Sequence, residues 1–174
     1  YHSFFIKTDG SLWGMGANET GRLGDGTATD RLGPAPIANN VTGVSTGVVH
    51  TLFVKADGTA WGMGRNGNGQ VGDGTHLQRL SPVQIGTNVR AVAAGGYHGF
   101  LLKNDNTLWG FGYNGEGELG NGTAVNPAGP VQVAANVAAV AAGLGHTVFL
   151  KTDGTLWAMG DNSLGQLGDG TTTN

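Results

Sequence analysis

The chain lacks cysteine and is poor in charged residues, and each shortage excludes a class of protein. Without thiols it can form neither a disulfide framework nor a thiolate metal site. Only 12% of its 174 residues are charged, and nine Lys and Arg against twelve Asp and Glu give a net charge of -3. A nucleic-acid-binding surface is basic, so we expect no nucleic-acid partner. No run of about 18 apolar residues occurs, so we expect no segment that spans a membrane.

Glycine, by contrast, is abundant, with 34 residues in the chain against an average of about 7%. Such a content often signals disorder, but 39% of the residues are apolar and four are Trp. These side chains suffice for a core if the glycines occupy fixed places, which the spacing of the sequence shows that they do.

The sequence repeats every 48 residues without insertions. Four residue types mark the period: His2, His50, His98 and His146; Lys7, Lys55, Lys103 and Lys151; Trp13, Trp61, Trp109 and Trp157; and Gly24, Gly72, Gly120 and Gly168. Three full repeats (1–48, 49–96 and 97–144) are followed by a partial fourth (145–174). We therefore expect residues 1–174 to form a single partial repeat domain.

Each period contains four short runs typical of β-strands, and no segment has the 3.6-residue period of a helix. In one period the runs are Val89–Ala94, His98–Lys103, Leu108–Gly112 and Pro130–Val133. Four-stranded antiparallel units at a fixed spacing predict an all-β fold, an arc of β-propeller blades with a 48-residue repeat. The first run has small side chains and is predicted near the axis, whereas the fourth begins with Pro and is predicted at the sheet edge.

The hairpins and the strand faces give further expectations. Asp9-Gly10, its copies and Asp105-Asn106 predict two-residue type I′ turns with positive φ at both central residues. The second strand is apolar on both faces and is predicted to be buried on both sides. We also expect Trp109 to be a large buried side chain.

An arc of fewer than four complete blades leaves two blade faces open. We expect residues such as Phe5, Leu12 and Phe149 to line these faces and to drive association. The predicted partners are therefore a second copy of the chain, or remaining blades that close the propeller.

The repeated motif can be followed in the last copy, where Gly143-x-x-His146-Thr147 leads through Lys151 to Trp157. It continues through Gly160, Asn162 and Gly165 and ends at Gly168-Asp169-Gly170-Thr171. Present four times in register, this pattern resembles the regulator of chromosome condensation repeat. The resemblance implies a seven-bladed propeller, of which this chain would be about half. It also implies a binding protein, since family members include nucleotide-exchange factors of a small GTPase and secreted bacterial binding proteins.

Several motifs resemble ligand-binding sites, and each can also be explained by a structural role. Gly67-x-Gly69-x-x-Gly72 matches a dinucleotide fingerprint but precedes turn residues rather than a helix. The Asp25-type loops offer one carboxylate each, which fits a turn better than calcium. The four aligned histidines are expected to hydrogen-bond neighbouring loops rather than form a metal ring. No nucleophile constellation appears, so we expect no enzyme activity, no metal and no cofactor. The off-pattern His76 is free to contact a partner.

Residues that depart from the repeat are the candidates for recognition. The link between the first and second strands and the loop after the third strand open on one face of a blade. The residues predicted to bind there are Tyr1, Arg65, Asn68, Tyr97, Tyr113, Glu116 and Leu164. They favour a non-catalytic protein-binding module, because Tyr and Arg are enriched at binding hot spots. The alternatives are a GTPase exchange factor, which the equal repeat lengths disfavour because they leave no wedge insertion, and a carbohydrate-binding propeller. The composition favours a bacterial, extracellular or cell-surface protein.

Overall fold

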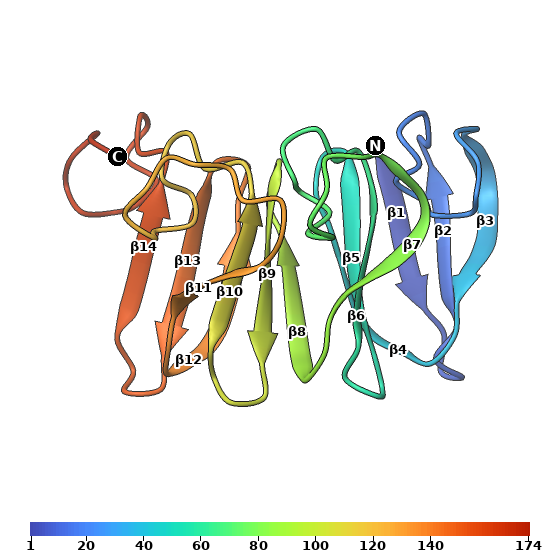
Figure 1. Cartoon of the computed structure of the whole chain (residues 1–174), viewed down its shortest axis with the longest axis horizontal. Helices are drawn as coiled ribbons and strands as arrows, with labels where there is room; N and C mark the ends of the chain where they lie inside the picture. The colour runs from blue at the N-terminus through green and yellow to red at the C-terminus, as the bar shows by residue number, and fades with distance from the viewer.

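The computed structural model describes all 174 residues, and all of its regular secondary structure is β-strand. Antiparallel strands form four sheets that stand side by side in chain order (Figure 1). The structure contains no helix, and therefore none that could cross a membrane. The predicted all-β arc of propeller blades is confirmed.

The strands follow the four runs predicted in each repeat. Sheet 1 contains β1 (His2–Ile6), β2 (Leu12–Gly16) and β3 (Arg31–Ala38). Sheet 2 contains β4 (Val41–Thr46), β5 (His50–Lys55), β6 (Ala60–Gly64) and β7 (Arg79–Gly86). Sheet 3 contains β8 (Val89–Ala94), β9 (His98–Lys103), β10 (Leu108–Gly112) and β11 (Val131–Ala134). Sheet 4 contains β12 (Val137–Ala142), β13 (His146–Lys151) and β14 (Leu156–Gly160).

The order of strands within each sheet is their order in the chain, so the proline-containing strand lies at the edge as predicted. Pro82 lies inside β7 rather than at its start, where the register between β6 and β7 is interrupted. An edge strand tolerates this interruption because one side of its backbone needs no partner. Sheets 1 and 4 have three strands each. β1 has no partner on its inner edge, where the first strand of a repeat would pair, and β14 has none on its outer edge, where the fourth would pair.

The hairpin turns differ from the prediction. Gly10 has a φ of 80°, but Asp9 has no positive φ, and the same holds for the three later copies. The amide of Gly10 donates to the carbonyl of Lys7, and the amide of Lys7 donates to the carbonyl of Ser11. The loop therefore has three residues, a turn closed by one left-handed residue. The type I′ prediction was wrong because the Asp side chain caps its own turn, with Asp9 Oδ1 accepting from the Ser11 amide at 2.9 Å.

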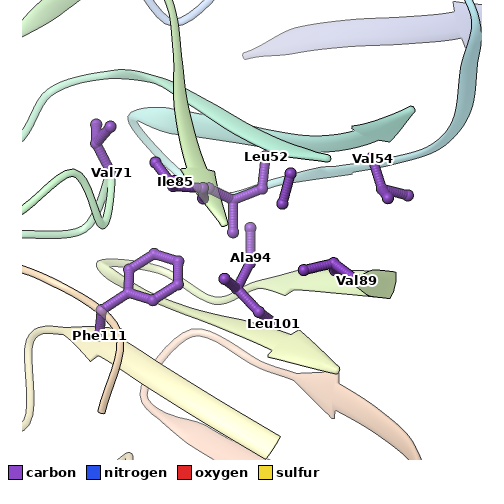
Figure 2. Close-up of a cluster of buried hydrophobic side chains, with 9 residues drawn as sticks. Leu52, Val54, Val71, Ile85, Val89, Ala94, Leu101 and Phe111 are labelled. Carbon is purple, nitrogen blue, oxygen red and sulfur yellow. The ribbon is translucent and has the colours of Figure 1, made fainter. Parts of the chain in front are cut away.

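The core lies between the sheets, in the three seams where neighbouring sheets pack face to face. Figure 2 shows the central seam, where Leu52 and Val54 of sheet 2 meet Leu101 and Phe111 of sheet 3. The predicted burial of the second strand on both faces is confirmed for β9, in which Phe100 is 0% and Leu101 is 1% exposed. Each such side chain contributes about 1.5–3 kcal/mol relative to an exposed one.

Trp61 and Trp109 pack against the seam clusters but are only partly buried, so the expectation of a buried Trp109 holds only in part. Trp109 is half-buried, and its Nε1 donates to Thr107 Oγ1 at 2.8 Å. The Lys103 Nζ lies 4.1 Å from the centroid of the indole ring, and all four repeats have this cation–π pair. The 48-residue spacing of Lys therefore follows from the spacing of Trp.

The two end faces of the arc carry other residues than those expected. Leu12 and Phe149 are buried in the internal seams, at 0% and 7% exposure. Phe5 is 37% exposed at the N-terminal end, while Leu150 and Leu156 of sheet 4 are 38% and 71% exposed. Two of the three residues expected at the open ends were therefore assigned to the wrong side of their strands or sheets.

Candidate functional site

The ends of the sheets form two different surfaces. The loop face carries the links between the first and second strands and the long loops after the third strand, at the top of Figure 1. The turn face, at the bottom, carries the three-residue hairpins. The hairpins are alike in the four repeats, whereas the long loops differ in sequence, so the loop face is the surface that varies from repeat to repeat.

A buried asparagine fixes the path of each long loop. Asn114 Nδ2 donates to Asn121 Oδ1, to the Thr123 carbonyl and to the Val125 carbonyl, and its Oδ1 accepts from the Leu119 amide at 2.9 Å. Corresponding bonds anchor the other loops at Asn18, Asn66 and Asn162, and all four asparagines are 0% exposed. The anchors occupy the interior of each loop and leave its outward residues free to vary.

The Asp25-type loops are turns, as predicted. Asp25 Oδ1 accepts from the amide and the hydroxyl of Thr27 and from Asn18 Nδ2. Its Oδ2 pairs with Arg31. Both carboxylate oxygens are thus engaged within the loop, and at Asn121 an amide oxygen accepts the same Thr bonds.

The glycine patterns also lie in turns. Gly69 and Gly72 have φ values of 81° and 83°, and the segment that follows them is not helical. Since the dinucleotide fingerprint needs a helix N-terminus to bind the pyrophosphate, the interpretation of this pattern as a structural loop is confirmed.

Two of the four aligned histidines form hydrogen bonds across a seam. His2 Nε2 lies 2.9 Å from Thr51 Oγ1, and His98 Nε2 lies 3.0 Å from Thr147 Oγ1, each across a seam. The partner is therefore a strand of the next sheet, not a loop as expected. His50 has no partner for either ring nitrogen, because Gly99 occupies the position of the threonine.

Burial lowers the pKa of three of these imidazoles, those of His2, His50 and His98, and so favours their neutral form. It lowers the pKa of His98 to about 4, with a smaller effect of His146, and it lowers the pKa of the fully buried His50 to about 3. No group of three His, Asp or Glu side chains converges well enough to hold a metal ion. His2 and His98 accordingly act as seam contacts.

A cleft of about 490 Å³ opens on the loop face between sheets 3 and 4. It brings together four residues predicted to bind: Tyr97, Tyr113, Glu116 and Leu164. The remaining lining residues were not predicted; they are Glu118, Leu144, Gly145, His146, Asp161 and Gln166. We call this site the acidic cleft, because it contains three carboxylates and neither Lys nor Arg.

The other three predicted residues lie elsewhere. Tyr1 is 96% exposed and lines a separate hollow of about 430 Å³ beside the ends of the inner strands β4, β8 and β12. Arg65 is exposed, and Asn68 donates its amide to Gln70 Oε1 at 2.8 Å. Both stand in the loop after β6, one repeat before the acidic cleft. The off-pattern His76 is exposed in that same loop.

Glu118 is the most buried carboxylate of the acidic cleft, at 1% exposure. Its Oε2 accepts from the Glu116 amide at 3.0 Å. Burial raises the pKa of Glu118, and the nearby charges of Glu116 and Asp161 add to this effect. The bond from the Ser163 amide, in contrast, lowers the pKa of Asp161. The cleft thus concentrates negative charge beside two tyrosine rings.

Comparison with known sequences identifies the repeat. The sequence model described as the Regulator of chromosome condensation (RCC1) repeat matches residues 9–54, 57–102 and 105–150. The chain belongs to the RCC1 repeat family. A second model of the RCC1 repeat matches residues 41–70, 89–118 and 137–166, so that Glu118 is the last residue of one match. The acidic cleft is therefore built from RCC1 repeats themselves. No curated protein matches the chain in sequence.

Solved structures show the same architecture. Human WBSCR16 is 25% identical with a TM-score of 0.88, over 99% of this chain and 48% of the other. Prp20p from Saccharomyces cerevisiae is 21% identical with a TM-score of 0.71, over 82% and 40%. Yeast RCC1 (Prp20) bound to Kap60 gives 22% identity and a TM-score of 0.77, over 92% and 40%. The chain spans less than half the length of these three proteins.

Proposed function

We propose that this RCC1-repeat chain is a non-catalytic protein-binding module that recognises its partner on the loop face. The observation that carries the proposal is the acidic cleft, which gathers Tyr97, Tyr113, Glu116 and Leu164 at one seam. Tyrosine is enriched at hot spots because it offers a large, rigid contact area with one polar end. Leu164 is 91% exposed, and such a side chain gains free energy when a partner covers it.

The scaffold beneath the cleft supports the same reading. The buried Asn114 and Asn162 anchor the two loops that border it, so their outward side chains are held in place before a partner arrives. Pre-ordered loops lose less conformational entropy on binding than mobile ones do. Tyr113 and Asp161 stand at equivalent places in consecutive repeats, where Ala17 and Arg65 stand in the others. The scaffold is constant while the recognition residues vary.

Relatives with the same fold support a protein as the class of partner. Yeast RCC1 (Prp20) is bound to Kap60 in one structure, and Prp20p is described with its binding properties to Gsp1p and histones. A carbohydrate partner has less support, because Tyr113 aligns with Ala17, Arg65 and Asp161 and no aromatic site repeats around the arc. The exchange-factor alternative also has less support, since the repeats have equal length and no insertion protrudes.

We also propose that the open ends of the arc are covered, either by a second copy of the chain or by further blades. The exposed side chains of Phe5, Leu150 and Leu156 support this association. The bacterial and extracellular expectations rest on composition alone and stay predictions.

A double variant tests the binding surface. Partner candidates are recovered by affinity capture on the chain from its native source, and each is then measured by calorimetry. Replacing Tyr97 and Tyr113 by Ala is expected to keep the fold and to weaken binding by about 2 kcal/mol or more.

The matched control lies on the turn face. Asn104→Ala and Thr152→Ala change two exposed positions where Ala56 stands in the equivalent hairpin, so the fold tolerates them. These changes are expected to leave the affinity unaltered. Unchanged affinity in the tyrosine variant, with loss in the control, would place the binding surface on the turn face and refute the proposal.

A further inference from the structure

We propose that the acidic cleft receives the guanidinium group of an arginine side chain presented by the protein partner. This inference rests on the proposed function and names the chemistry that the binding surface recognises. Four observations carry it: carboxylates without an ion pair, an oxygen of Glu118 that accepts no hydrogen bond from the protein, flanking tyrosine rings, and the different charges of the corresponding residues in other repeats.

The carboxylates of the cleft have no cationic partner within the protein. The ion pairs of the chain join Arg22 to Glu19, Arg31 to Asp25 and Arg79 to Asp73, and none involves a residue of the cleft. Glu116 accepts only from the Asn174 side-chain amide. A cleft with three uncompensated negative charges attracts a cation and excludes an anion.

Glu118 offers a carboxylate oxygen that accepts no hydrogen bond from the protein. Its residue is 1% exposed and lines the cleft, and only Oε2 accepts a hydrogen bond from the protein, from the Glu116 amide. A donor that enters the cleft can therefore form a charge-assisted hydrogen bond with the other oxygen.

The remaining walls suit a planar cation with an apolar stem. Tyr97 and Tyr113 supply aromatic rings, and Leu144 and Leu164, which are 69% and 91% exposed, supply apolar contact. Guanidinium groups stack on aromatic rings and donate to carboxylates through a flat fork, whereas an ammonium acts as a compact point charge. The methylene groups of arginine can lie along leucine side chains.

A divalent metal ion fits the site less well. Calcium needs six to eight oxygen ligands around one point. No set of three Asp, Glu or His side chains in the chain converges in that way. The three carboxylates of the cleft do not converge on one point, which suits a guanidinium, whose charge is shared among several donors.

The corresponding positions in other repeats show that the acidity is specific to this seam. Glu118 corresponds to Arg22 and Gln70, and Asp161 corresponds to Arg65 and Tyr113. Residues at these places near sheets 1 and 2 are thus basic, while those between sheets 3 and 4 are acidic. The same backbone frame carries opposite charge at its two ends, so the acidic cleft is the place for a basic side chain.

The test uses small probes on the intact chain. N-acetylarginine amide is titrated at low salt while NMR follows the methyl signals of Leu144 and Leu164 and the ring signals of the two tyrosines. The expected result is saturable shifts confined to these residues, with a Kd of about 1–10 mM, which suits one side chain without its partner. N-acetylcitrulline amide has the same shape without the charge and is expected to give no shifts, and N-acetyllysine amide is expected to bind more weakly.

A charge-removal variant provides the matched protein control. Glu116→Gln, Glu118→Gln and Asp161→Asn together keep the shape and the acceptors of the cleft. Gln70 and Gln166 already occupy the place of Glu118 and accept the equivalent loop amide. The variant is expected to lower the affinity for the arginine probe by about tenfold or more. Equal binding by the variant, equal binding of the citrulline probe, or tighter binding of the lysine probe would overturn the inference.

Failure of this inference can be told apart from failure of the proposed function. If the captured partner loses affinity with the tyrosine variant but not with the charge-removal variant, the loop face binds protein without an arginine. If neither variant alters partner binding, the proposed binding surface itself is wrong. In both results the assignment of an arginine to the acidic cleft is refuted.

Discussion

Leu108 and Leu156 stand one repeat apart in the same strand position, yet one is buried and the other is not. Leu108 of β10 is 0% exposed, whereas Leu156 of β14 is 71% exposed. The strand β10 pairs with β11 on its outer side, and residue 108 packs against sheet 4. The strand β14 has neither an outer partner nor a following sheet. The same pattern therefore yields a core residue or a surface residue according to its neighbour.

This difference teaches how a repeat protein distributes its stability. Each inner sheet supplies half of two seams, each end sheet supplies half of one, and no sheet completes a seam alone, so much of the free energy of folding resides in contacts between neighbours. The residues at the end of the arc retain a core composition without a core environment. The two leucines give a direct measure of what one neighbouring sheet contributes.

The largest expected effect is a loss of stability at the inner position. Leu108→Ala removes a fully buried side chain and leaves a cavity, so the free energy of unfolding is expected to fall by about 2–5 kcal/mol. Leu156→Ala is expected to cost less than about 1 kcal/mol, because an exposed side chain leaves no cavity. Urea denaturation of both variants measures the difference. Equal losses would mean that the end of the arc is covered in solution.

The second prediction concerns that cover. Leu156→Lys places a charge on the open C-terminal end and is expected to weaken self-association by about tenfold or more. Leu77 is the matched control, since it is 65% exposed in a loop away from the end, and Leu77→Lys is expected to change nothing. Light scattering over a dilution series gives both results. A stable monomer of the unaltered chain at all concentrations would show that the open ends do not pair.

The smallest expected effect lies in the central seam. It tests whether the buried His50 can be given a hydrogen-bond partner. A Cβ on Gly99 would lie 2.8 Å from Phe111 Cε2 and from Leu52 Cδ1, so Gly99→Thr alone is expected to destabilise. With Phe111→Met the seam regains the Thr and Met of its two neighbours, and His50 gains a hydroxyl partner. The free energy of unfolding of the double variant is expected to be about 1 kcal/mol higher than the sum of the two single changes predicts.

The measurement for this seam is a double-mutant cycle of urea denaturation curves. Thr147→Gly serves as the reciprocal change, because it removes the bond to His98 from the next seam. Additive effects of Gly99→Thr and Phe111→Met would show that His50 does not use the new hydroxyl.

Much of the fold follows from the sequence because the period is strict. Trp109 and its copies fix the third strand, and the flanking glycines and alternating apolar residues fix the others. The errors concern relations that a single repeat does not contain. Whether Leu12 and Phe149 point into a seam or toward an open end depends on which side of each strand or sheet meets the adjacent sheet. The turn at Asp9 depends on a side-chain bond that satisfies the backbone with one left-handed residue.

Only part of the candidate site was predicted from the sequence, again because some of its residues depend on a neighbouring repeat. Tyr97, Tyr113 and Glu116 depart from the repeat, and that departure pointed to the loop face. Glu118 was missed because its position was taken as part of the constant scaffold. The residues at this position in the other repeats are in fact Arg22, Gln70 and Gln166. That change of charge was a visible signal. Its meaning depends on Asp161 of the next sheet, which lies 43 residues further along the chain.

The buried asparagines have a consequence for how such surfaces can be rebuilt. Every side-chain bond of Asn114 reaches a residue no more than 11 positions away, and the corresponding side-chain bonds of Asn18 and Asn66 are equally local. Most of the bonds that hold each loop therefore lie within the loop itself, and one backbone bond, from Gly26 to Leu80 or from Gly74 to Ala128, ties it to the next repeat. A loop exchanged between repeats together with its asparagine would keep the internal bonds, so the charge and shape of the loop face can be recomposed one seam at a time.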